Sequence, residues 1–160
     1  MAPPAEADVQ PRARTQWPLG VFIGIVWACW DLTAKALLED RLMYGSDHRQ
    51  VLTPWLDLRL SYDAAVWPAA SLLGSAAATV TLLLLLVRIR RASSAVAISL
   101  GLGGFLGDLL DQLPDRTLTH FIALHPFGFA IPPFNFSEVG IGAFGVFAAV
   151  EMLRRLARSP

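Results

Sequence analysis

Several ionisable side chains lie within long apolar stretches of this sequence, and four of them form two closely spaced pairs. Asp31 and Lys35 are four residues apart, and Asp108 and Asp111 are three apart, so on a helix each pair shares one face. An ionisable group inside a membrane span costs about 2.5–3.5 kcal/mol, which makes each of them a candidate for function. For Asp31 and Lys35 the simpler interpretation is an ion pair that holds the end of a helix in place.

His120 and Glu138 are of residue types that could form an acid–base pair. An imidazole acts as a base when neutral and as an acid when charged, and a carboxylate can activate water. The same types also suit a metal ligand pair or an ordinary hydrogen bond at the membrane interface. No ligand spacing such as His-Glu-x-x-His is present, so we expect no metal and no other cofactor. His48 and His125 are expected to face solvent, and Cys29 to be a small apolar helix residue.

The composition places these residues in a membrane protein. Of 160 residues, 54% are hydrophobic and 16% are charged, whereas soluble domains carry about 25% charged residues; the mean hydropathy is +0.49. No residue from Ala64 to Val87 is charged, and about 20 apolar residues span a bilayer. An ordinary soluble enzyme, a nucleic-acid binder with a basic stripe and a disulfide-stapled secreted domain, which a single cysteine cannot build, are excluded.

Four apolar segments predict an all-α integral membrane protein with four transmembrane helices, over residues 17–38, 64–87, 95–113 and 136–156. Residues 17–156 form one predicted membrane domain, between a disordered cytosolic tail at 1–16 and a cytosolic tail at 157–160. Glycines in the third segment predict close helix packing: Gly101, Gly103, Gly104 and Gly107.

The distribution of arginine predicts the orientation, because cytosolic loops carry an excess of basic residues. Eight arginines fall on one side of a four-span topology: Arg12, Arg14, Arg88, Arg90, Arg91, Arg154, Arg155 and Arg158. The other side has four, diluted by acidic residues: Arg41, Arg49, Arg59 and Arg116. Both termini are therefore expected in the cytosol, with loops 39–63 and 114–135 outside.

The two outer loops differ in pattern. Leu56, Leu58 and Leu60 alternate with polar residues, which predicts a short strand and a small β-like rim at the membrane surface. The second loop is apolar but interrupted by prolines, and we expect it to lie on the interface or dip into it. In this topology all the candidate polar residues converge on one patch near the outer leaflet.

Four motifs in this order resemble the lipoprotein signal peptidase (signal peptidase II) family, which are four-helix aspartic peptidases of bacterial membranes. They cover nearly all of residues 17–156. Asp31-Leu-Thr-Ala-Lys35 is similar to the family's Asp-x-x-x-Lys, and VLTPWLDLRLSYDAAVW to its strand leading into Asn-x-Gly-Ala-Ala-Phe. GGFLGDLLDQL with RTLTHFI resembles Gly-Gly-x-x-Gly-Asn-x-x-Asp-Arg followed by Val-x-Asp-Phe, and PPFNFSEVGIG resembles Pro-x-Phe-Asn-x-Ala-Asp-x-x-Ile.

The sequence departs from these motifs where the family's chemistry resides. His120 and Glu138 occupy the positions of the family's two catalytic aspartates. Other motif positions also differ: Tyr62 replaces an Asn, Ala64 a Gly, Asp108 an Asn and Gln112 an Arg. Four positions match: Asp31, Lys35, Asp111 and Asn135. The resemblance thus implies a retained scaffold with an altered reactive centre.

The resemblance leaves two functions open. The first is a membrane endopeptidase of the bacterial inner membrane that cuts lipid-modified signal peptides at the outer leaflet. It would use His120 and Glu138 as its acid–base pair and Asp108 and Asp111 as supporting carboxyls. The residues expected to line the substrate groove or to have structural roles are Asp31, Lys35, Tyr62, Gln112 and Asn135.

The second function is a non-catalytic relative that binds a lipidated peptide, a lipid or a partner helix in the same groove. The expected partners are a prolipoprotein or other signal peptide and membrane lipid, with no nucleic acid, and a monomeric state. The two functions differ in geometry, because His120 and Glu138 side chains within about 4 Å of each other favour chemistry.

Overall fold

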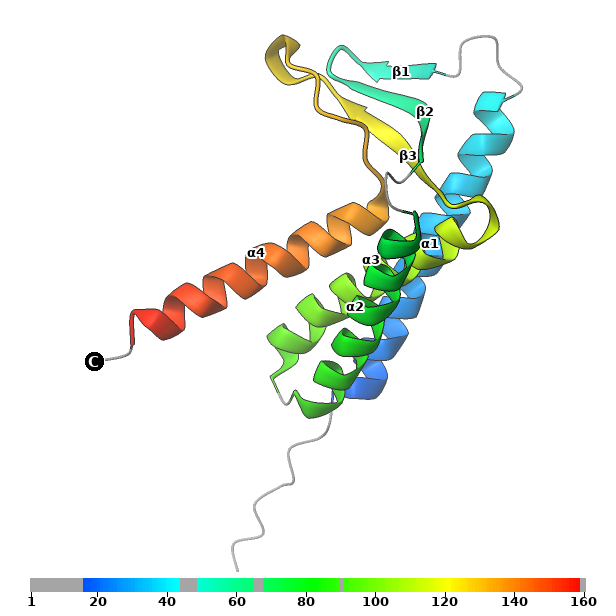
Figure 1. Cartoon of the computed structure of the whole chain (residues 1–160). Helices are drawn as coiled ribbons and strands as arrows, with labels where there is room; N and C mark the ends of the chain where they lie inside the picture. The colour runs from blue at the N-terminus through cyan, green and yellow to red at the C-terminus, as the bar shows by residue number, and fades with distance from the viewer. Residues whose placement is uncertain (1–15, 44–48, 65–67, 90, 159–160) are drawn as a thin grey trace, which may run out of the picture.

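The computed structural model describes residues 16–43, 49–64, 68–89 and 91–158, which form four long helices and a three-stranded sheet (Figure 1). The helices are α1 (Trp17–Met43), α2 (Pro68–Arg88), α3 (Ala92–Asp115) and α4 (Phe136–Leu156). The strands are β1 (Arg49–Thr53), β2 (Leu56–Ala64) and β3 (Thr117–Leu124), and a short 3-10 turn, η1 (Pro126–Gly128), follows β3.

All four helices are long and apolar enough to cross a membrane, so the four predicted spans are confirmed. The predicted start of the second span at residue 64 is wrong, because Ala64 ends β2 and α2 begins at Pro68. Proline suits the first position of a helix, where its missing N–H would have no partner. The predicted tail at 1–16 falls almost wholly outside the described residues, as do residues 159–160 of the second tail and His48.

Helix α3 is the centre of the bundle and packs against α1, α2 and α4. Small residues make these contacts close: a Cβ added to Gly103 would lie 2.5 Å from the carbonyl oxygen of Gly24 on α1. The predicted close packing of the glycine-rich segment is therefore confirmed. Figure 1 shows α4 diverging from α2 toward the C-terminal end of the chain.

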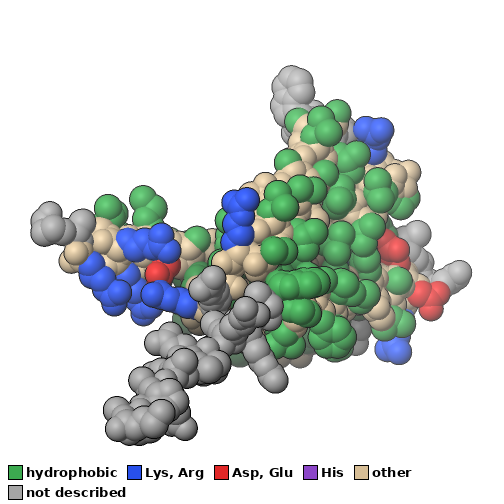
Figure 2. Space-filling model, turned by 90° about the horizontal axis from the view of Figure 1, so that it is seen from below, with side chains coloured by type: hydrophobic (Ala, Val, Ile, Leu, Met, Phe, Trp, Pro, Cys, Tyr) green, Lys and Arg blue, Asp and Glu red, His purple; other side chains and the backbone are tan. Residues whose placement is uncertain are grey.

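The apolar surface is divided between a small core and the outside of the helices. The buried cluster between α2 and α3 is centred on Leu82, Leu86, Ile98 and Leu102. Many large apolar side chains on the helices are exposed instead, and Figure 2 shows apolar side chains over much of the surface. Exposed apolar helix faces are what a lipid environment requires.

The sheet is antiparallel in the order β1-β2-β3 and lies at one end of the helices (Figure 1). The predicted strand is confirmed as β2, but β3 lies in the proline-interrupted outer loop 114–135, for which no strand was predicted. Arg116 ends α3 in the left-handed conformation (φ 63°) and turns the chain into β3. Pairing of Ser61 with His120 then brings the end of β2 beside the third motif.

Candidate active site

A buried ion triad joins α1 to α3. The ammonium of Lys35 lies 2.7 Å from Asp31 Oδ2 and 2.9 Å from Asp111 Oδ2. The side chains of Asp31 and Lys35 are almost completely buried. The predicted Asp31–Lys35 ion pair is confirmed, and Asp111 is a third partner that its sequence position did not reveal. A buried cation between two carboxylates fixes the relative position of the two helices.

Asp111 also connects the triad to the sheet. Its Oδ2 accepts a hydrogen bond from the backbone N–H of Thr119 (2.8 Å), and its Oδ1 accepts one from the Thr119 hydroxyl (3.3 Å). The carbonyl of Thr119 in turn accepts a hydrogen bond from the Asn135 side-chain amide at 3.1 Å. Thr119 precedes His120, so these contacts hold the backbone of β3 immediately before the candidate histidine.

Asp31 connects the triad to the start of α4. Its Oδ1 accepts a hydrogen bond from the backbone N–H of Ser137 (3.0 Å), and its Oδ2 accepts one from the Ser137 hydroxyl (2.8 Å). Ser137 is fully buried and was not among the predicted site residues. The available signal was its place in the first turn of a helix, where free N–H groups favour a carboxylate.

Asn135 and Glu138 form a capping box at the start of α4. Asn135 Oδ1 accepts from the Glu138 N–H at 2.9 Å, and Glu138 Oε2 accepts from the Asn135 N–H at 3.3 Å. Such reciprocal bonds satisfy two backbone donors that a helix start otherwise leaves free. One oxygen of Glu138 is therefore fixed by its own helix, and the other remains for contacts outside it.

The second oxygen of Glu138 faces His120. His120 Nε2 lies 3.4 Å from Glu138 Oε1, and His120 Nδ1 lies 3.2 Å from Asp63 Oδ2 without the angles of a hydrogen bond. The His120 side chain is 7% exposed, whereas those of Glu138 and Asp63 are 41% and 65% exposed. Sequence analysis missed Asp63, which the β2–β3 pairing alone brings to this position.

Hydrogen bonding with Glu138 raises the pKa of the His120 imidazole above its ordinary value, with a further contribution from the charge of Asp63. Burial acts in the opposite direction and is the smaller effect. The arrangement therefore favours an imidazolium between two carboxylates. An imidazolium next to a carboxylate can donate a proton at one atom while the carboxylate accepts one at another.

Asp108 and Gln112 lie on α3 close to this network, and both are buried. Gln112 Oε1 accepts a hydrogen bond from the Ser71 hydroxyl of α2 at 2.8 Å, and its amide donates to the Asp108 carbonyl at 3.0 Å. Asp108 Oδ1 is buried and accepts no hydrogen bond within the described part of the chain. It is thus a polar atom that a substrate or water could satisfy.

Tyr62 lies on the other face of the sheet from His120. It pairs with Thr119, whereas His120 pairs with Ser61, and neighbouring residues of a strand face opposite sides. Burial and the nearby Glu39 carboxylate raise the pKa of the Tyr62 phenol. Tyr62 therefore does not separate His120 from Glu138.

Two remaining residues, His125 and Cys29, are not part of this cluster. His125 does not simply face solvent as predicted, because its Nε2 lies 3.1 Å from the buried carboxylate of Asp57. Cys29 is exposed on α1, away from the polar network. Among the described residues, no three His, Cys, Asp or Glu side chains are grouped so that they could hold a metal ion.

No family model matches the chain. A lipoprotein signal peptidase from Ralstonia nicotianae is 28% identical over 148 residues, which cover 85% of this chain and 84% of that protein.

Two solved structures described as bacterial membrane enzymes share the fold. The first has a TM-score of 0.76 at 18% identity and covers 89% of this chain and 92% of its own. The second has a TM-score of 0.74 at 16% identity, and the match covers 85% of this chain and 93% of that structure's chain. Motif order, sequence similarity and fold agree, and the chain is similar to lipoprotein signal peptidase.

Proposed function

We propose that this protein is a signal-peptidase-II-like endopeptidase of a bacterial inner membrane, in which His120 and Glu138 replace the aspartic dyad. The observation that carries the proposal is the 3.4 Å separation of His120 Nε2 and Glu138 Oε1 at the two dyad positions. The Ralstonia relative supports a lipid-modified signal peptide as the substrate. The extracytoplasmic position of the site and the cytosolic termini follow from the arginine distribution and belong to the proposal.

In the proposed reaction Glu138 acts as the base and His120 as the acid. The Glu138 carboxylate removes a proton from water as the water oxygen attacks the scissile carbonyl carbon, and the His120 imidazolium donates a proton to the carbonyl oxygen. When the tetrahedral intermediate collapses, the C–N bond breaks. Glu138 gives its proton to the departing nitrogen, and His120 recovers its own from the hydroxyl oxygen. Both groups return to their starting states.

The pair resembles an aspartic dyad in its proton content and differs in its charge. Two aspartates that share one proton carry one proton and a net charge of −1. An imidazolium beside a carboxylate also supplies one dissociable proton to the reaction, but the pair is neutral. Asp63 at 3.2 Å from His120 restores a negative charge to the group.

A specific observation favours the second candidate, a non-catalytic relative that binds a lipidated peptide, a lipid or a partner helix. Glu138 Oε2 already completes the capping box, and the His120 contact ties β3 to α4. Both contacts stabilise the fold without chemistry. A protein that retains the scaffold to hold a ligand would keep them as well.

Cleavage of a diacylglyceryl-modified prolipoprotein by the purified protein in detergent distinguishes the two candidates. We expect the wild type to release the signal peptide, and Glu138→Gln and His120→Gln to release almost none. Asp40→Asn is a control that removes an exposed carboxylate elsewhere on the described surface, and it should retain activity. If the wild type binds the lipidated substrate without cutting it, the peptidase proposal is wrong and the binding function is supported.

A further inference from the structure

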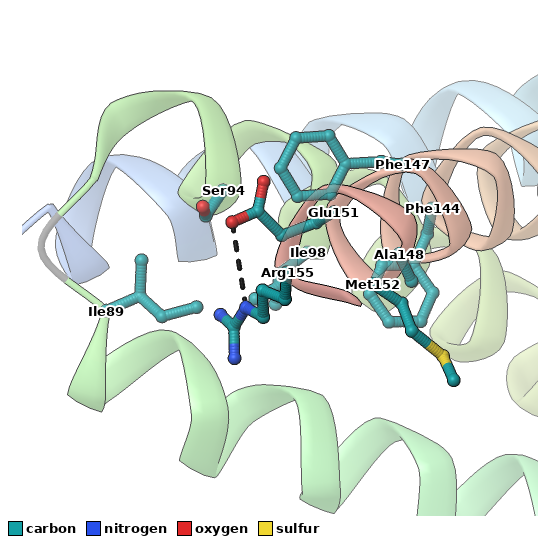
Figure 3. A pocket seen from close by; sticks show the side chains of 9 residues that line it. All are labelled: Ile89, Ser94, Ile98, Phe144, Phe147, Ala148, Glu151, Met152 and Arg155. Carbon is teal, nitrogen blue, oxygen red and sulfur yellow. Dashed lines mark ion pairs between the residues drawn. The ribbon is translucent and has the colours of Figure 1, made fainter. Parts of the chain in front are cut away.

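A groove runs along α4, beside the start of α3 and the connection from α2 to α3, at the end of the bundle opposite His120 and Glu138. Helix α4 packs on α3, which forms the floor of the groove with Ser94 and Ile98. Phe144 and Phe147 of α4 form an apolar wall of this cavity, which has a volume of about 310 Å³ (Figure 3). The part of the groove that Phe144 and Phe147 line is therefore suited to a hydrocarbon chain.

The groove continues into a second, basic cavity of about 460 Å³. The two cavities share Ile89, Ser94, Glu151 and Arg155, so they lie directly beside each other. The basic part adds three arginines to its lining: Arg88, Arg91 and Arg158. Figure 2 shows basic side chains gathered on the outer part of α4 around acidic atoms. The groove thus changes from apolar to positively charged along its length.

The arginines of the groove have donors available for a ligand. Glu151 Oε1 is the acidic partner of two of them, at long distances of 3.6 Å from Arg91 and 3.7 Å from Arg155. The side chains of Arg91 and Arg155 are 76% and 80% exposed. Four guanidinium groups against one carboxylate leave a surplus of positive charge. Guanidinium groups bind phosphate oxygens with two parallel hydrogen bonds.

We infer that this groove binds an anionic phospholipid, with the phosphate at Arg91 and Arg155 and an acyl chain along Phe144 and Phe147. The charge of the groove argues against a signal peptide in this part of it, because the leading region of such a peptide is itself basic. A general excess of arginine on one side of the membrane accounts for charge at this end but requires no groove. Arg154 illustrates the difference, since it is adjacent to Arg155 and lines neither cavity.

Arg155, which lines the groove, and Arg154, which does not, provide a matched pair of variants. Lipid binding to each would be measured by native mass spectrometry in detergent. The protein would be titrated with phosphatidylglycerol and with phosphatidylcholine that has the same acyl chains. The wild type should retain one phosphatidylglycerol more tightly than phosphatidylcholine, and Arg155→Gln should weaken this binding about fivefold, the contribution of one arginine near an anionic lipid. Arg154→Gln removes the same charge one residue away and should leave the binding unchanged. Equal weakening by the two variants would show diffuse attraction and overturn the proposal.

A second pair of variants tests the apolar part without changing charge. Ala148 lines the groove and Ala149 does not. Ala148→Trp should displace the lipid, whereas Ala149→Trp should not, and soluble glycerol phosphate should fail to compete. Undiminished lipid binding by Ala148→Trp, or competition by glycerol phosphate equal to that of the lipid, would overturn the site. Equal melting temperatures of the four variants would establish that each remains folded.

Discussion

His120 is the residue at which this chain departs most in chemistry from the family it resembles. A carboxyl group at this position would add negative charge beside Glu138, whereas an imidazolium is attracted by it and by Asp63. That attraction raises the pKa of His120, which favours the charged form that the proposed acid requires. The two replacements are chemically consistent with each other, because each favours the protonation state that the other needs.

The raised pKa of His120 predicts a loss of stability as the pH increases. Glu138 and Asp63 stabilise the imidazolium in the folded state only. This contribution is complete below the unfolded-state pKa of about 6.5 and is lost as the pH rises through the higher folded-state value. The melting temperature of the wild type in detergent should therefore fall over that range. The fall should be smaller in His120→Gln, and an identical pH dependence in both proteins would contradict this account.

The sequence identified the ionisable residues of the site except Asp63, but not all of their partners. Asp31, Lys35, Asp111 and Asn135 stand out because their polar groups lie in apolar segments or follow a motif. Ser137 and Thr119 are ordinary in type, and their roles depend on backbone N–H groups that only the fold exposes to Asp31 and Asp111. A charged residue in an apolar segment can be recognised from its type, whereas the group that it binds depends on the tertiary structure.

At the scale of the elements, a ring of polar contacts helps to position the strand and helix that carry the site. Lys35 holds α1 to α3, Asp111 holds α3 to β3, and Asn135 holds β3 to the start of α4. Asp31 closes the ring by binding the first turn of α4. Each link is buried or partly buried, so each is shielded from competing water.

Removing the central cation should destabilise the whole arrangement. Lys35→Met leaves the carboxylates of Asp31 and Asp111 without their shared counter-charge, and breaking a buried pair in this way costs about 3–5 kcal/mol. The free energy of unfolding, measured in detergent with a denaturant, should fall by that amount. Asp31→Asn introduced into Lys35→Met removes one unpaired charge and should recover part of the loss. No recovery would show that the triad is not the source of the effect.

The crossing of α1 and α3 gives a second prediction at this scale. Gly103→Ala places a methyl group 2.5 Å from a backbone oxygen of Gly24, which cannot move without separating the helices. We expect a loss of about 1–3 kcal/mol in the free energy of unfolding, as for other overpacked sites. Gly142→Ala is the control, because an added Cβ there meets nothing within 4 Å. If both variants were equally stable, the close approach of α1 and α3 would be contradicted.

At the scale of the molecule, the sequence predicted the membrane helices well and the sheet only in part. Long apolar runs define α1 to α4 by length alone, and alternation of Leu56, Leu58 and Leu60 defines β2. The strand β3 escaped prediction because Thr117–Leu124 is mainly apolar and does not alternate regularly, and it lies between a helix and a proline-rich segment. Its pairing with β2 supplies the Asp63–His120 contact, so the missing strand concealed part of the site.

The central claim is that Glu138 and His120 together hydrolyse a peptide bond, and the kinetics of Glu138→Gln test it most directly. The amide keeps the size of the side chain but cannot accept the proton from water, and loss of a general base lowers the rate about 10²–10⁴-fold. With a diacylglyceryl-modified prolipoprotein as substrate, we predict that kcat falls by this factor while KM is unchanged. A Glu138→Gln protein with wild-type kcat would contradict the account, because Glu138 would then serve only the capping box.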